Sequence, residues 1–139
     1  MTDKKETIVE LKALLASTYT LYLKTHNYYW NVTGPMFSAL HILLETHYTE
    51  LAMAVNEIAE RILALGAKAP DSYSKFKELS LIKESSGEPT ATEMLRDLTS
   101  DQEIIAKLAL KVVGAASAVG DQATAGIATG RQSIHEKNA

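Results

Sequence analysis

Cysteine is absent from the sequence of 139 residues, which excludes disulfide bonds and thiolate metal sites. Long apolar runs are also missing, because none reaches the roughly 18 residues that a membrane-spanning helix requires. The charged start, MTDKKETIVELK, does not have the pattern of a signal peptide. Together these absences favour a cytoplasmic protein without membrane contact.

An excess of basic residues is missing as well. The 14 Lys and Arg residues are outnumbered by 17 Asp and Glu, and the formal net charge is −3. This balance argues against a general nucleic-acid binder, which needs at least a local basic patch. Hydrophobic residues make up 46% of the chain and charged residues 22%, as in ordinary globular proteins. The length suits one domain with a real core, so we expect a single domain over residues 1–139.

The longest helical pattern covers residues 34–66. Gly34-Pro35 is expected to open the helix, because proline is tolerated in a first turn, and Gly66 suits its end. The apolar residues recur on one broad face, which predicts burial against other helices. That face contains Leu40, Leu43, Leu44, Leu51, Val55, Ile58, Ile62 and Leu65.

Apolar spacing predicts three other long helices and a short one in the connector before the third. Their ranges are 5–31, 90–119 and 122–137 for the long helices and 72–81 for the short one. Thr90 or Thr92 is expected to cap the third helix and Asp121 the last. The last helix is weak, since Gly126 and Gly130 each cost about 1 kcal/mol relative to alanine. We therefore expect an all-α, up-down four-helix bundle with a short extra helix between the second and third.

Most of the aromatic residues gather in the second half of the first helix. They are Tyr19, Tyr22, Tyr28, Tyr29 and Trp30. Their helical spacing favours a bulky core seam packed against the second helix. In the connector, Tyr73, Phe76, Leu79 and Leu81 are expected to cover one part of the bundle.

Four polar residues follow the edge of the apolar face of residues 34–66: His41, Glu45, Asn56 and Glu60. All four fall within about 100° of one another around the helix axis. The small residues Ala52 and Ala59 lie between them, which leaves room for another backbone to approach. The pattern is typical either of an interface edge with ordinary salt bridges or of a binding site.

The axial spacing restricts how these residues can share a ligand. His41 and Glu45 lie one turn apart, as do Asn56 and Glu60. Asn56 follows Glu45 by 11 residues, or about 16 Å of helix. One metal ion cannot contact both pairs of one chain. A shared site requires a second copy of the helix running antiparallel, and two-fold symmetry then produces two identical sites per dimer.

Three stretches together resemble the Dps mini-ferritins, the starvation DNA-protection family: KTHNYYWNVTGPMFSALH, TELAMAVNEIAERILALG and DQATAGIATGRQSIHEKNA. The resemblance covers essentially the whole chain. It implies a ferritin-like bundle, a hollow shell of twelve subunits and oxidation of Fe(II), preferably by hydrogen peroxide, with storage of ferric mineral. It also implies an iron centre across a two-fold dimer interface, and hence roles in iron homeostasis and oxidative stress.

The resemblance implies five ligand positions for that centre. His41, Glu45 and Glu60 match three of them, whereas Tyr29 stands where the family has His and Asn56 where it has Asp. Neutral tyrosine is a poor Fe(II) ligand, and asparagine offers an oxygen without charge. We expect a di-iron or single-iron site of reduced affinity, with slow or absent ferroxidase activity, so that the enzymatic assignment stays open.

Two further family features are altered in this chain. The family's three-fold pore is lined by acidic residues of the last helix. Asp121 matches the first of these positions, but Gly126 and Gly130 stand at the later ones. The family's usual apolar turn after HEK is not present before Ala139. DNA binding in the family depends on Lys-rich tails, whereas here the Met1–Glu6 segment holds only two lysines, offset by two acids. We expect DNA binding to be weak or absent, although association with a bacterial nucleoid fits the family.

Other titratable residues are assigned supporting roles. His26 and His47 are expected near the surface rather than among metal ligands, and His135 at the surface or between subunits. Glu50 and Glu57 are expected on a solvated or inter-subunit face. Two alternative functions remain: a structural cage subunit that has lost catalysis, and a protein that binds another metal, such as zinc, at the three matching positions.

Overall fold

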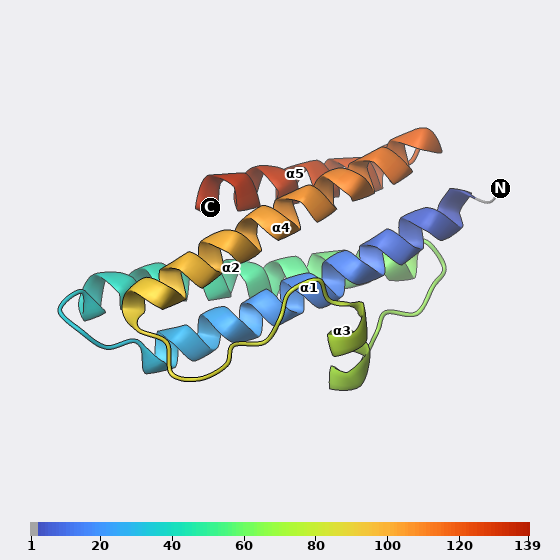
Figure 1. Ribbon diagram of the computed structural model, residues 1–139. Coiled ribbons are helices and arrows are strands. Elements are labelled where there is room, and N and C mark those ends of the chain that lie inside the picture. The colour runs from blue at the N-terminus through green and yellow to red at the C-terminus, as the bar shows by residue number, and fades with distance from the viewer. Residues whose placement is uncertain (1–2) are drawn as a thin grey trace.

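The computed structural model describes residues 3–139 of the chain, and this part is all-helical (Figure 1). Over these residues the structure has four long helices and one short helix. Their bounds are α1 Asp3–Asn31, α2 Phe37–Ala64, α3 Tyr73–Leu79, α4 Ala91–Ala118 and α5 Gln122–Asn138. The predicted all-α bundle with a short helix between the second and third long helices is confirmed.

The long helices form two antiparallel hairpins that pack on each other (Figure 1). α1 pairs with α2 and α4 pairs with α5, and α1 also packs along α4. The short α3 lies beside α1 in the long connection from α2 to α4. α5 contacts α4 extensively and α2 only slightly, so the last helix depends on few direct contacts with the first hairpin. No helix within residues 3–139 is both long and apolar enough to cross a membrane.

Local sequence signals fix the helix ends. Gly34 has φ of +107°, a left-handed conformation that glycine adopts without strain. The chain therefore turns through Gly34 to Met36 and α2 begins at Phe37, so the prediction that Gly34-Pro35 opens the helix is wrong by about one turn. Gly66, with φ of +89°, follows the end of α2 as expected.

The two later helices begin with the predicted caps. The hydroxyl of Thr90 accepts a hydrogen bond from the Glu93 backbone N–H at 3.2 Å, and the Glu93 carboxylate accepts one from the Thr90 N–H at 2.8 Å. This reciprocal pair forms a capping box. Asp121 caps α5 by accepting from the Thr124 N–H at 3.1 Å. Both starts are thus specified by residues within four positions of one another.

The core lies between the four long helices and consists mainly of aliphatic side chains. Its fully buried members include Leu11, Leu14, Leu15, Leu21, Ile58, Ile62, Ile105 and Val112. On α2 the predicted apolar face is buried at Leu44 and Leu51 as well, but Leu43 remains 42% exposed. α5 contributes a different surface, since its buried residues are Thr124, Ala128, Arg131 and His135. The last helix is therefore attached to the bundle largely through polar groups.

Two predictions about the aromatic and connector residues need correction. Tyr28 alone of the aromatic run is fully buried, whereas Tyr22 and Tyr29 are half-buried and Trp30 is 58% exposed. The seam is therefore a partly exposed band rather than a core layer. In the connector, Phe76 does pack on the bundle, stacking on Tyr19 with ring centroids 4.6 Å apart. Tyr73 at the start of α3 is 76% exposed, and Leu81 in the connector after α3 is 55% exposed, so these two side chains do not cover the bundle.

Candidate metal centre

The four polar residues singled out on α2 all lie on its partly or fully accessible side. His41 is half-buried, while Glu45, Asn56 and Glu60 are exposed. The nearby core positions Leu44 and Ile58 of the same helix are buried, which places the polar residues beside the apolar face. At Glu45, Asn56 and Glu60 the edge is therefore open to a partner or a ligand.

His41 is held between two aromatic rings. The Tyr29 ring from α1 approaches it with centroids 3.8 Å apart, and the Phe37 ring approaches it at 4.7 Å. The Nδ1 atom of His41 is out of contact with solvent and has no hydrogen-bond partner among residues 3–139. The structure thus brings Tyr29 directly against His41 and leaves one ring nitrogen uncommitted. An imidazole with an uncommitted nitrogen suits a transition-metal ion.

One chain does not supply a complete metal site. Among residues 3–139, no three His, Asp or Glu side chains lie close enough together to hold one ion. His41 and Glu45 near the start of α2 are therefore separated from Glu60 near its end, as the axial spacing requires. Any centre that uses all three residues needs a second chain.

Asp121, the residue assigned to the pore, makes contacts within its own chain. Its carboxylate accepts hydrogen bonds from the Thr124 hydroxyl at 2.6 Å and from Arg61 at 3.0 Å, and Arg61 also donates to the Thr124 hydroxyl at 2.8 Å. Burial raises the pKa of Asp121. The hydrogen bonds from Thr124 and the positive charge of Arg61 outweigh this effect and hold the pKa below its ordinary value. The carboxylate stays ionised and joins α5 to the end of α2.

His135 was expected at the surface or between subunits, but the structure buries it completely. Its Nδ1 lies 2.6 Å from the amide oxygen of Gln102, and its Nε2 lies 3.0 Å from Arg131. Because a guanidinium only donates, Nε2 accepts and Nδ1 carries the proton that Gln102 receives. Burial, together with the charge of Arg131, lowers the pKa of His135 to about 3. The ring is a neutral structural bridge between α4 and α5.

The remaining candidates have local structural contacts. Glu50 forms an ion pair with Arg131, and Glu57 is exposed. His26 stacks on Tyr48 at 4.3 Å, and His47 is half-buried, with its pKa lowered by burial and partly restored by Glu50. Glu57 thus lies on an accessible face as expected, whereas Glu50 is tied to Arg131 within the chain.

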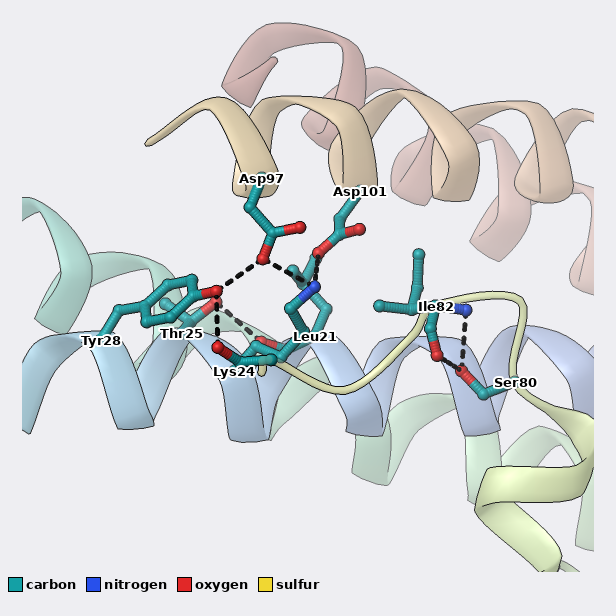
Figure 2. Close-up of polar contacts among 9 residues, drawn as sticks. Leu21, Lys24, Thr25, Tyr28, Ser80, Ile82, Asp97 and Asp101 are labelled. Atoms are coloured by element: carbon teal, nitrogen blue, oxygen red, sulfur yellow. Dashed lines mark hydrogen bonds and ion pairs between the residues drawn. The ribbon is translucent and has the colours of Figure 1, made fainter. Parts of the chain in front are cut away.

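Sequence reasoning missed a buried ionic network between α1 and α4. Figure 2 shows Lys24 of α1 pointing toward Asp97 and Asp101 of α4. Its ammonium lies 2.8 Å from Asp97 and 2.6 Å from Asp101, and the Tyr28 hydroxyl donates to Asp97 at 2.6 Å. Burial raises the pKa of Asp101 against the opposing effect of Lys24. The helical spacing could have indicated that Lys24 is buried. It lies three residues after buried Leu21 and four before buried Tyr28, and so on the same face of the helix.

A hollow lies elsewhere in the described structure. It has a volume of about 690 Å³ and runs between α1 and the connector around α3, where Tyr19, Leu23, Phe76 and Ile82 form its apolar side. None of the four polar residues of α2 lines it. A small-molecule pocket therefore does not coincide with the candidate metal ligands.

Comparison with known proteins identifies relatives over nearly the full length. The sequence model of the ferritin-like domain family matches residues 8–139. The chain is 35% identical over 135 residues to DNA protection during starvation protein 2 of Bacillus anthracis, covering 97% of this chain and 92% of that protein.

Solved structures give the same result. A Dps protein from Bacillus brevis superposes with a TM-score of 0.96 at 30% identity, covering 99% of this chain and 93% of that one. Dps from Vibrio cholerae O1, described as a member of a broad superfamily of ferritin-like diiron-carboxylate proteins, superposes with a TM-score of 0.93 at 29% identity, covering 98% and 86%.

Proposed function

This chain belongs to the Dps family of the ferritin-like superfamily, and from that premise we propose that it is a subunit of a cytoplasmic iron-storage shell. The shell oxidises Fe(II), with hydrogen peroxide as the preferred oxidant, and retains the ferric product. Iron is the substrate and the cargo in this proposal. The supporting observation is the divided ligand set of α2, which one chain cannot close into a site.

The chemistry of the divided set suits iron. His41 and Glu45 of one subunit and Glu60 of the partner subunit would supply one imidazole and two carboxylates, a donor set compatible with Fe(II). The two glutamates are exposed and the Nδ1 atom of His41 has no hydrogen-bond partner, so none of the three is bonded elsewhere in the described part of the chain. A two-fold dimer then contains two such sites, and further association of dimers into a dodecamer encloses a cavity.

The altered positions lower the expected affinity. Tyr29 replaces an imidazole by a phenol, which is a poor ligand for Fe(II). Asn56 removes one negative charge, so a site holds two carboxylates to balance a dication. We therefore propose a weakened centre that holds one Fe(II) more readily than two.

A structural cage is the second candidate function, and the contact of Tyr29 with His41 favours it. With ring centroids 3.8 Å apart, the phenol occupies space beside the imidazole that a metal ion would otherwise use. A cage subunit would assemble in the same way but would not oxidise iron. A third outcome is a shell that binds zinc at His41, Glu45 and Glu60 and excludes iron.

Three measurements on the purified protein distinguish these proposals. Light scattering after gel filtration measures the mass, and a monomer would refute the divided site. Anaerobic titration calorimetry with Fe(II) and with Zn(II) measures the affinity of each metal. Stopped-flow absorbance after adding peroxide measures the rate of Fe(III) formation. An oligomer with no rate above buffer would support the cage, whereas tight stoichiometric Fe(II) binding would refute the weakened centre.

DNA is not proposed as a tight partner. Lys4 and Lys5 are offset by Asp3 and Glu6, and residues 1–2 of this segment lie outside the described residues. Counterion release from so few lysines contributes little affinity at physiological salt. Gel-shift assays over a salt series test this point, and retention of DNA at physiological salt would contradict it.

A further inference from the structure

Four tyrosines form a continuous row of ring contacts between α1 and α2 that ends at His41. Along this tyrosine row, Tyr19 and Tyr22 have ring centroids 5.9 Å apart, Tyr22 and Tyr48 6.3 Å, and Tyr48 and Tyr29 5.1 Å. Tyr29 then contacts His41 at 3.8 Å. Tyr19 precedes Tyr29 by ten residues of α1, so the row extends about 15 Å away from the candidate metal ligand.

His26 lies at the centre of the row. Its ring stacks on Tyr48 at 4.3 Å and lies 5.6 Å from Tyr22 and 6.2 Å from Tyr29. It also contacts Trp30 at 4.0 Å. A neutral imidazole accepts a proton near neutral pH, which makes His26 a suitable base for phenols that lose an electron and a proton together.

Packing alone does not account for the row. All four members are only half-buried, and their hydroxyls have no hydrogen-bond partner among residues 3–139. The other two tyrosines differ: Tyr28 is buried with its hydroxyl bonded to Asp97 and Ser85, and Tyr73 is 76% exposed. Desolvation, with the neighbouring Tyr29 and Glu45, raises the pKa of Tyr48 and keeps this phenol protonated. The chain thus places four unanchored phenols in one series.

The proposed reaction needs a second electron donor when only one Fe(II) is bound. Hydrogen peroxide takes up two electrons when it is reduced to water and hydroxide, whereas one Fe(II) supplies one. A site weakened at Tyr29 and Asn56 that holds a single Fe(II) would release a hydroxyl radical unless another group supplied the second electron. Tyr29 is the redox-active side chain in contact with His41.

We propose that the tyrosine row is a one-electron relay that supplies the second electron to peroxide at the iron site, an inference that rests on the proposed function. Fe(II) and hydrogen peroxide give Fe(III), hydroxide and a hydroxyl radical. Tyr29 transfers a hydrogen atom to this radical, which forms water and leaves a tyrosyl radical. The radical passes to Tyr48, Tyr22 and Tyr19 as each phenol in turn gives up an electron and a proton.

A second Fe(II) ion closes the cycle. It reduces the tyrosyl radical, which takes up one proton and becomes tyrosine again, and the iron becomes Fe(III). In sum, two Fe(II), one peroxide and one proton give two Fe(III), one hydroxide and one water. The relay therefore lets two ions that are not bound side by side share one peroxide, and it prevents release of the hydroxyl radical.

The test uses the assembled protein loaded anaerobically with one Fe(II) per subunit and then mixed with peroxide. Freeze-quench electron paramagnetic resonance detects the tyrosyl radical, and a nitrone spin trap detects escaped hydroxyl radical. The informative variant combines Tyr22→Phe with Tyr48→Phe, because both rings are retained while the oxidisable hydroxyls are lost and the metal ligands stay unchanged. Tyr73→Phe removes an exposed phenol outside the row and serves as the matched control.

We expect the wild type and Tyr73→Phe to show the tyrosyl signal with little trapped hydroxyl radical. In the double variant the radical should stay on Tyr29, because the next two carriers are missing, and oxidation at Tyr19, measured by peptide mass spectrometry, should be lost. Iron oxidation without any tyrosyl signal, or equal oxidation of Tyr19 in all three proteins, would overturn the relay while leaving the proposed function intact. Absence of iron oxidation would overturn both.

Discussion

The guanidinium of Arg131 on α5 donates hydrogen bonds from both terminal nitrogens to the carboxylate of Glu50 on α2, and its Nη2 lies 3.1 Å from Glu50 Oε1. Arg131 is 3% exposed, and it also contacts buried His135. The Nε atom of Arg131 is buried without a partner among residues 3–139. This pair and the Arg61–Asp121 pair are the polar connections that hold the weakly apolar α5 to α2.

Replacing Arg131 should destabilise the protein. In Arg131→Met, Glu50 and the neutral His135 lose their donor, and we expect a loss of about 2 kcal/mol in the free energy of unfolding. Urea unfolding followed by circular dichroism measures this change at fixed protein concentration. Arg96→Met, which removes an exposed guanidinium from α4, is the control and should have little effect. Equal losses in the two variants would show that the ion pair is not important.

His135 should make stability depend on pH. Its pKa is about 3 in the folded chain and 6.5 in a model compound, so between these values the unfolded chain binds a proton that the folded chain does not. Stability is therefore complete above pH 6.5 and falls as the pH drops, by up to about 1.4 kcal/mol per pH unit. His47, whose pKa is also lowered by burial, acts in the same direction.

Melting temperatures between pH 4.5 and pH 7.5 measure this dependence. His135→Gln removes the titrating ring and should flatten the pH profile, even if it lowers the melting temperature at every pH. His26→Gln removes a half-buried ring of α1 that packs on Tyr48 of α2, far along the chain from His135, and should keep the wild-type slope. A slope unchanged in His135→Gln would contradict the assignment of a buried neutral imidazole.

The buried network around Lys24 should show strong coupling. Lys24→Met leaves Asp101, whose side chain is 7% exposed, without its cation, and we expect a loss of about 3–5 kcal/mol. Asp101→Leu leaves Lys24 with only Asp97, whereas the double variant removes both charges and should recover part of the loss. Urea unfolding of all four proteins gives the coupling energy.

Lys107→Met is the control for the network, since Lys107 lies on an exposed position of α4. It should leave the unfolding midpoint almost unchanged. If the losses of the two single variants added without coupling, the ionic contacts seen in Figure 2 would contribute little beyond packing.

Restoring the altered ligand positions should strengthen the iron site. Tyr29→His adds an imidazole beside His41, and Asn56→Asp adds a carboxylate near Glu60. Together we expect an Fe(II) affinity higher by about tenfold, which corresponds to about 1.4 kcal/mol, and faster peroxide-driven oxidation. Anaerobic calorimetry and stopped-flow absorbance measure the two effects.

The matched control for this gain is Asn138→Asp, which adds the same charge at the end of α5. It should leave the Fe(II) affinity unchanged. No gain in the double variant, in a protein whose oligomeric mass is unaltered, would show that His41, Glu45 and Glu60 do not form the iron site.

The order and limits of the helices follow from the sequence because their causes are local. Apolar residues three and four positions apart predicted α1, α2 and α4, and Thr90, Asp121 and Gly66 marked helix ends through contacts within a few residues. The divided ligand set was also readable, since the rise of a helix alone separates Glu45 from Asn56.

Only the tertiary structure decided which polar groups are buried. Lys24 meets Asp101 across 77 positions of sequence, and Arg131 meets Glu50 across 81. The surface assignment of His135 was wrong because its partner Gln102 comes from another helix. A buried charge is tolerated only when another residue pairs with it. In both ion pairs the partner is distant in sequence, so no local pattern in either segment predicts the contact.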